Sequence, residues 1–257
     1  MINSIIKTEE KYISCFCDEI VFEDYKRYSD DLITDMYSHN FIMIDKDVDM
    51  DRIHEVIDHE IQDRKSKGYG FLRVVSHSDI DESKLKGFEA SYEIESYVYF
   101  GVKTEDYNKL ADKTSAKVLK VQDDLTQEHG RFVDVAANYT FMTMEFAIRR
   151  IDRKMKVYRD QKKPLDLYVC YDDIEPVGNC ELLFGESIAK IEDFDILSMH
   201  QRKGYGTCFV RNLLMKCLEK QIPYAYLVTD RDDTAKEMYE KIGMSLVGHR
   251  TELMFRL

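Results

Sequence analysis

Gln201-Arg202-Lys203-Gly204-Tyr205-Gly206-Thr207 is the stretch around which this chain is organised. Residues 191–197 before it predict a strand, and the apolar residues within 209–218 after it recur at helical spacing. A strand therefore runs into a glycine loop that opens a helix. The first turn of a helix has unpaired N–H groups and partial positive charge, so an anion can bind there. The two glycines lack a Cβ, which lets a diphosphate approach the amides of residues 203–207 closely.

Two well-known phosphate loops do not fit this stretch. A dinucleotide G-x-G-x-x-G fingerprint needs glycine or alanine where Phe209 stands, and a P-loop needs Gly-Lys-Ser/Thr after four intervening residues. The pattern that fits is Gln/Arg-x-x-Gly-x-Gly. In it the chain resembles the GNAT superfamily of acyl-CoA-dependent N-acetyltransferases, and the resemblance implies that the loop binds the pyrophosphate of coenzyme A (CoA).

Two further motifs stand in the order that this resemblance implies. Upstream, Pro176-Val177-Gly178 opens a strand, as in the family's third strand. Downstream, residues 232–244 are similar to the family's Asn-x-x-Ala-x-x-apolar-Tyr-x-x-x-Gly-Phe helix, which covers the cofactor. Asp232 stands where the family has Asn, and Met244 stands where it has an aromatic residue. The resemblance covers residues 116 to 257.

The resemblance also implies roles for individual residues. The strand before the loop would pair with pantetheine and present an amide, from Ile196 or Leu197, to the thioester oxygen. Tyr239 would protonate the departing thiolate, since a phenol of pKa ~10 can exchange a proton with a thiol of pKa ~8.5. The predicted general base is Glu192, with Asp193, Asp195 or a water relay as alternatives. The predicted cofactor-binding residues are Ile196, Leu197, Ser198, Gln201, Arg202, Lys203, Gly204, Tyr205, Gly206, Thr207 and Asp232.

The net charge of −12 is unevenly distributed along the 257 residues. Residues 1–115 carry 15 Lys+Arg against 26 Asp+Glu, whereas residues 116–257 carry 22 against 23. An acidic field disfavours binding to nucleic acid and could draw a cationic substrate toward a cleft. A soluble acidic surface explains the same charge without any ligand.

Composition also bounds the location and the redox chemistry. No stretch approaches the ~20 apolar residues of a membrane span, and residues 1–10 hold no apolar signal core, so we expect a cytoplasmic protein without membrane contact. Six cysteines form no Cys-x-x-Cys pair and predict reduced, packed thiols. No metal is implied.

Residues 1–105 predict a mixed α/β domain, and 106–115 a polar linker. The elements expected in the domain at 1–105 are a helix at 50–67 and strands at 12–16, 19–22, 40–44, 71–75 and 91–102. Their order is similar to the second half of a GNAT domain, which indicates a degenerate second copy. Alternating aspartates at 45–51 imitate a calcium loop, but Met50 and Val56 stand where Gly and Glu are required, so a helix-capping loop explains them better.

The predicted fold class is α/β (α+β): a smaller α/β domain followed at 116–257 by a GNAT-type, mostly antiparallel sheet flanked by helices. The predicted function is transfer of acetyl from acetyl-CoA to a primary amine of a small cationic molecule or peptide, by direct attack in a ternary complex. The alternative is an acyl-CoA-binding sensor or scaffold with a GNAT shell and weak catalysis. The acceptor is not specified by the sequence, and a homodimer is left open.

Overall fold

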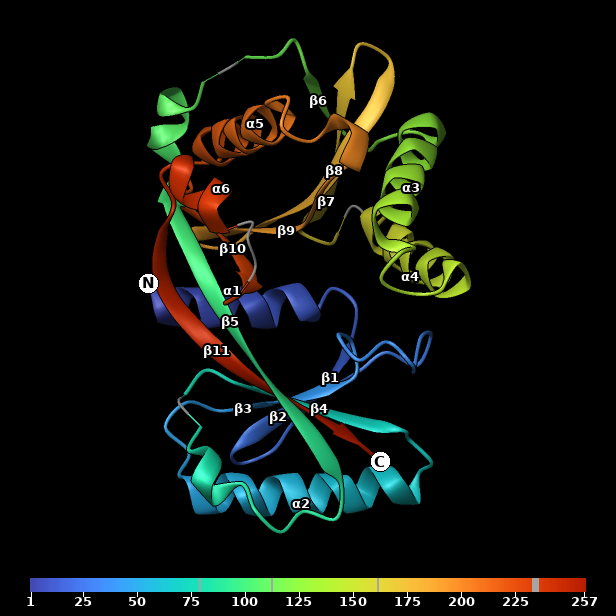
Figure 1. Ribbon diagram of the computed structural model, residues 1–257, viewed down its shortest axis with the longest axis vertical. Helices are drawn as coiled ribbons and strands as arrows, with labels where there is room; N and C mark the ends of the chain where they lie inside the picture. The colour runs from blue at the N-terminus through green and yellow to red at the C-terminus, as the bar shows by residue number, and fades with distance from the viewer. Residues whose placement is uncertain (79, 112, 161, 233–235) are drawn as a thin grey trace. The chain divides into compact units, whose positions relative to one another are not determined.

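The computed structural model describes residues 1–78, 80–111, 113–160, 162–232 and 236–257. The chain forms two compact units that are interleaved along the sequence (Figure 1). Unit 1 comprises residues 1–15, 99–228 and 234–247, and unit 2 comprises residues 16–98, 229–233 and 248–257. The sequence predicted two consecutive domains instead. Contacts assign the first helix and the expected linker to the unit that holds the glycine loop, and the last strand from Gly248 onward to the other unit.

Unit 1 is built on a sheet with the strand order β5-β10-β9-β8-β7-β6. Strands β7, β8 and β9 form an antiparallel meander, and β10 runs parallel to β9. Helix α5 lies on one face of this sheet and α1 on the other (Figure 1). The elements are α1 (Ile2–Ile13), β5 (Ser91–Lys103, which enters this unit at Tyr99), η2 (Thr104–Lys109), β6 (Lys117–Lys120), α3 (Asp124–Asn138), α4 (Met144–Tyr158), β7 (Leu165–Asp172), β8 (Glu175–Phe184), β9 (Ile188–Ile196), η3 (Ser198–His200), α5 (Tyr205–Glu219), β10 (Tyr224–Asp230) and α6 (Lys236–Lys241).

Unit 2 has the strand order β1-β2-β3-β4-β11, in which only β3 and β4 are parallel. Its core forms where α2 buries Ile53, Ile57 and Ile61 against Leu72 and Phe255. The apolar spacing of these isoleucines, at i, i+4 and i+8, places them on one helix face. The elements are β1 (Asp18–Val21), β2 (Tyr25–Ser29), β3 (Phe41–Ile44), α2 (Met50–Ser66), β4 (Phe71–Ser76), η1 (Glu82–Lys84) and β11 (Ser245–Arg256).

Each unit contains a pair of parallel strands joined by a helix: β3-α2-β4 in unit 2 and β9-α5-β10 in unit 1. The strand that follows each pair in the chain lies beside a strand of the other pair. Strand β5 follows β4 in the chain but neighbours β10, and β11 follows β10 but pairs with β4. This order agrees with the predicted second GNAT-like copy in the first half of the chain, which stays a prediction.

Most expected elements are present within a few residues of their predicted bounds, but the strand expected at 12–16 is wrong. Helix α1 extends to Ile13 because Ile5, Glu9 and Ile13 lie on one face and are buried. The acidic segment before α2 caps that helix as predicted: the Asp49 carboxylate accepts from the amides of Asp51 and Arg52. The six cysteines are buried free thiols.

Unit 2 also contains a buried group of three potential metal ligands, Cys17, Asp30 and His39, whose ligand atoms lie within 4.8 Å of one another. The His39 Nδ1 atom is 2.9 Å from Asp30 Oδ2, and the Cys17 thiol donates to the His39 carbonyl. These contacts hold together the segment between β2 and β3. Among the residues described, none of the helices has the length and hydrophobicity needed to cross a bilayer.

Candidate active site

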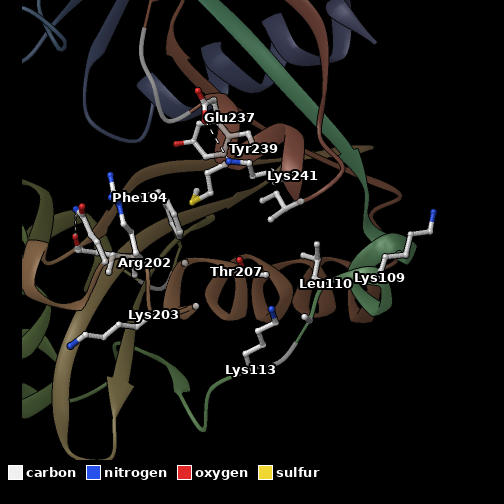
Figure 2. Close-up of a pocket in the computed structure, with 17 residues that line it drawn as sticks. Lys109, Leu110, Lys113, Phe194, Arg202, Lys203, Thr207, Glu237, Tyr239 and Lys241 are labelled. Atoms are coloured by element: carbon white, nitrogen blue, oxygen red, sulfur yellow. Dashed lines mark hydrogen bonds and ion pairs between the residues drawn. The ribbon is translucent and has the colours of Figure 1, made fainter.

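A cleft of about 960 Å³ lies in unit 1 beside the start of α5 (Figure 2). Its walls come from three segments that are far apart in the sequence. Residues 201–207 supply the glycine loop, and residues 237–242 supply α6 and the turn after it. The third wall consists of Lys109, at the end of η2, and of Leu110, Ala111 and Lys113 after it. Phe194 and Ile196 of β9 also face the cleft.

The glycine loop places helix-start amides, which have no intrahelical acceptor, beside this cleft. Helix α5 begins after Gly204, whose φ of +97° lies in the left-handed region that favours glycine. Because glycine has no side chain, no side-chain cap occupies the first amides of the helix. The amides of residues 205–207 have no intrahelical acceptor because they belong to the first turn. A Cβ on Gly206 would lie 3.4 Å from the Met238 sulfur and 3.7 Å from the Phe194 ring. A larger side chain there would fill the cleft.

The lining of the cleft is basic, although the protein is acidic. Five cationic side chains and one carboxylate line it: Lys109, Lys113, Arg202, Lys203, Lys241 and Glu237. Together with the partial positive charge of the α5 N-terminus, this lining favours an anionic ligand with several negative charges.

Strand β9 has a bulge, around which Phe194 points toward α5 and Asp193 points toward α4. Asn179 pairs with Asp195 and Glu181 with Glu192, so one residue of β8 lies opposite two residues of β9. Asp193 lies in this bulge with a φ of +45°. After it, Phe194 faces α5, where its ring is 5.6 Å from that of Phe209. Strand β8 approaches β9 closely here: a Cβ on Gly178 would lie 2.5 Å from the Asp195 carbonyl oxygen.

Beyond the bulge, β9 separates from β10 and leaves an open strand edge. The pairing with β10 runs from Ile188 to Ile191 and then stops. The amide of Leu197 donates to the Val177 carbonyl of β8 at 2.9 Å. Because successive residues of a strand direct their N–H groups to opposite sides, the Ile196 amide faces the side from which β10 has departed. Of the two amides predicted for the thioester oxygen, Leu197's is therefore already engaged.

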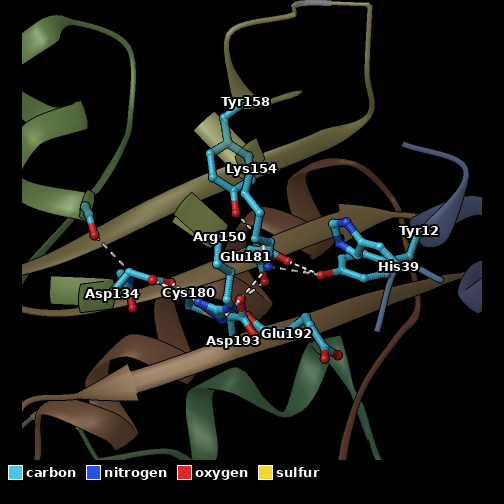
Figure 3. A network of polar contacts seen from close by, with 12 residues as sticks. Tyr12, His39, Asp134, Arg150, Lys154, Tyr158, Cys180, Glu181, Glu192 and Asp193 are labelled. Carbon is cyan, nitrogen blue, oxygen red and sulfur yellow. Dashed lines mark hydrogen bonds and ion pairs between the residues drawn. The ribbon is translucent and has the colours of Figure 1, made fainter. Parts of the chain in front are cut away.

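The carboxylates of the bulge contact α3 and α4 in a buried polar network (Figure 3). Arg150 Nη2 lies 2.6 Å from Asp193 Oδ2, and Lys154 Nζ also contacts this oxygen. Arg150 also donates to both oxygens of Asp134 at 2.8 Å. Burial acts to raise the pKa of Asp193, but the charges of Arg150 and Lys154 outweigh it and hold that pKa well below its usual range.

Asp195 lies in a different electrostatic environment two residues later. Burial, followed by repulsion from Asp193 and Asp134, raises the pKa of Asp195 to about 7. Its carboxylate accepts one hydrogen bond of 3.2 Å from Asn138 Nδ2 and remains partly exposed. The side chain can therefore exchange a proton near neutral pH.

Glu192, the predicted base, is engaged in a separate set of contacts. Its carboxylate lies 3.0 Å from Lys190 Nζ. Lys190 is almost fully buried and also pairs with Glu9 of α1, to which Tyr226 donates at 2.6 Å. The sequence could not show this arrangement, because it depends on α1, where a strand was expected at 12–16.

The other predicted site residues divide into two groups. Tyr239 lines the cleft from α6, with its ring buried and 6.0 Å from that of Phe100, and Ile196, Gln201, Arg202, Lys203, Gly204, Gly206 and Thr207 line it as well. Leu197, Ser198, Tyr205 and Asp232 are not among the lining residues. The Tyr205 hydroxyl donates to Asp172 at 2.5 Å, and the Asp232 amide donates to Asp230.

Sequence reasoning missed the third wall of the cleft. Lys109, Leu110 and Lys113 line it, although residues 106–115 were predicted to form a linker. The one available signal was Leu110, an apolar residue within a polar run, which is buried in the structure.

Residues 135–244 match the model of the Acetyltransferase (GNAT) family. An uncharacterized N-acetyltransferase of Bacillus subtilis (strain 168), CgeE, is 25% identical over 259 residues, which cover 92% of this chain and 91% of that protein. A GCN5-related N-acetyltransferase from Kribbella flavida has a similar fold, with a TM-score of 0.73, 12% identity, and coverage of 98% of this chain and 94% of that one. A functionally unknown conserved protein from Staphylococcus epidermidis ATCC 12228 superposes with a TM-score of 0.79, 17% identity, and coverage of 93% and 94%.

The chain contains a GNAT domain at residues 135–244. It is therefore an enzyme of the N-acetyltransferase family, and its fold is one that binds acetyl-CoA. The family and the fold class predicted from the glycine loop are confirmed. In this GNAT enzyme, the cleft at the start of α5 is the candidate acetyl-CoA site.

The buried network under β9 generates a stability prediction. Asp193→Asn leaves Arg150 and Lys154 without the charge that they share, and we expect it to lower the free energy of unfolding by about 3–5 kcal/mol. The control is Asp152→Asn, which removes the partner of Arg131 at a half-exposed surface pair and should cost about 0–1 kcal/mol. Urea denaturation of both variants measures the difference, and equal losses would contradict the role given to Asp193.

Proposed function

We propose that this enzyme transfers acetyl from acetyl-CoA to a primary amine of a small cationic molecule or peptide, by direct attack in a ternary complex. The observation that carries the proposal is the basic cleft, in which Gly206 and Thr207 at the start of α5 and Ile196 at the open edge of β9 line the same space. The excess of acidic residues in 1–115 supports a cationic acceptor, because such a field attracts positive charge.

In this proposal the CoA diphosphate binds the start of α5 beside Arg202 and Lys203. The pantetheine arm follows β9 past Phe194 and Ile196, and the Ile196 amide donates to the thioester oxygen as negative charge develops there. The amine nitrogen forms a bond to the acetyl carbon, and the bond from that carbon to sulfur breaks. Tyr239 gives its proton to the thiolate, and a base accepts the proton that the amine loses.

We propose Asp195 as that base, in preference to Glu192. Its pKa of about 7 suits proton transfer at neutral pH, and its side chain belongs to the face of β9 opposite Phe194. An amine that approached from the α3 side would meet Asp195 before it reached a thioester on the cleft side. Glu192 is held by Lys190, which favours a structural role.

The release of CoA tests the proposed acetyl transfer. Purified protein with acetyl-CoA and a panel of polyamines, aminoglycosides, amino acids and peptides should release CoA only when an acceptor is present. Tyr239→Phe should lower kcat by about 10²–10⁴-fold and leave the Kd for CoA within about twofold, since the phenol acts on the leaving group. Tight binding of CoA with no release across the panel would favour the sensor or scaffold instead.

The pH dependence of kcat tests whether Asp195 is the base. Because Asp195 must lose its proton to act, kcat should rise about tenfold per pH unit below pH 7 and level off above it. Asp195→Asn should abolish this rise and lower kcat by about 10²–10⁴-fold, whereas Glu192→Gln should keep the rise. The pH profiles of the three proteins decide the assignment. If Glu192→Gln lost the rise of kcat with pH and Asp195→Asn kept it, the base would be Glu192 instead.

A further inference from the structure

Leu110, Ala111 and Lys113, which lie between η2 and β6, form one wall of the cleft. At one end, η2 packs on α5, where the Arg211 guanidinium lies 5.5 Å from the centre of the Tyr107 ring, and Leu110 is buried. At the other end, β6 pairs with β7 in antiparallel register. Residues 113 and 114 lie directly against the glycine loop: a Cβ on Gly204 would be 3.3 Å from the Thr114 methyl group and 3.7 Å from the Lys113 Cβ.

Three lysines line the cleft outside the glycine loop, and their charges are not equivalent. Lys109 lies 2.8 Å from Asp106, and Lys241 lies 3.4 Å from Glu237. Lys113 forms no ion pair with any residue in the described part of the chain. Figure 2 shows its side chain extending toward α5, whereas that of Lys109 extends away. Lys113 is therefore the lysine of this wall whose charge is available to a ligand.

We propose that Lys113 binds the 3′-phosphate of CoA and makes the cleft selective for CoA over its 3′-dephospho form. This inference rests on the proposed function, in which the diphosphate already occupies the α5 amides, Arg202 and Lys203. The 3′-phosphate is a monoester with a charge of about −1.5 to −2 at pH 7, and it needs a separate cation. An ammonium on a flexible stem can reach such a phosphate as a point charge.

Calorimetric titration with CoA and with 3′-dephospho-CoA at one fixed ionic strength tests this subsite. The wild type should bind CoA about tenfold or more tightly than dephospho-CoA, as a charge-assisted phosphate contact provides. Lys113→Ala should lower the affinity for CoA by about tenfold and leave the affinity for dephospho-CoA within about twofold. The preference for CoA would then be lost. Lys113→Arg should keep it. The matched control is Lys220→Ala, which removes an exposed lysine at the other end of α5.

The other outcomes are distinguishable. Equal affinity of the wild type for both ligands would overturn the inference, because no group then senses the 3′-phosphate. An equal loss of affinity for both ligands in Lys113→Ala would also overturn the inference, since Lys113 would then contact the part of CoA that both ligands share. Binding of neither ligand by the folded wild type would instead reject the proposed function itself.

Discussion

The left-handed backbone of Asp193 is the constraint on which the site depends. A non-glycine residue with positive φ costs free energy, and here the surrounding contacts hold it in place. Arg150 and Lys154, from α4, fix its carboxylate on one face of the sheet. The bulge then directs Phe194 to the cleft, and β9 leaves β10 only a few residues before the glycine loop. The same distortion thus opens the strand edge and places the carboxylates away from the basic cleft.

The two helix starts of the parallel strand pairs show how local sequence decides anion binding. At α2, the Asp49 carboxylate already occupies the amides of Asp51 and Arg52, and the loop before it is acidic. At α5, Gly204 has no side chain, and basic residues surround the same type of amides. The start of α2 therefore lacks the free amides that a diphosphate needs. The proposed function accordingly predicts one CoA per chain.

Local patterns predicted the parts of the site that a short stretch determines. The glycine loop and the helix after it could be placed because their spacing follows from one strand, one turn and one helix. The role of Tyr239 came from the resemblance of residues 232–244 to the family's cofactor-covering helix. The role of Glu192 could not be judged, since its engagement by Lys190 depends on Glu9, more than 180 residues earlier. Lys113 was assigned to a linker for the same reason: polar composition does not reveal that η2 packs on α5 and that β6 pairs with β7.

Hydrogen–deuterium exchange of the full chain, with and without saturating CoA, tests most directly the claim that the first-turn amides of α5 hold the cofactor. These amides have no intrahelical acceptor, so they should exchange fast in the free protein and slowly in the complex. We predict that CoA protects residues 196–207 and the wall at 109–113, and leaves the Asp49 loop at 45–51 unchanged. Protection of 45–51 in their place, or CoA binding without any change at 204–207, would contradict the account.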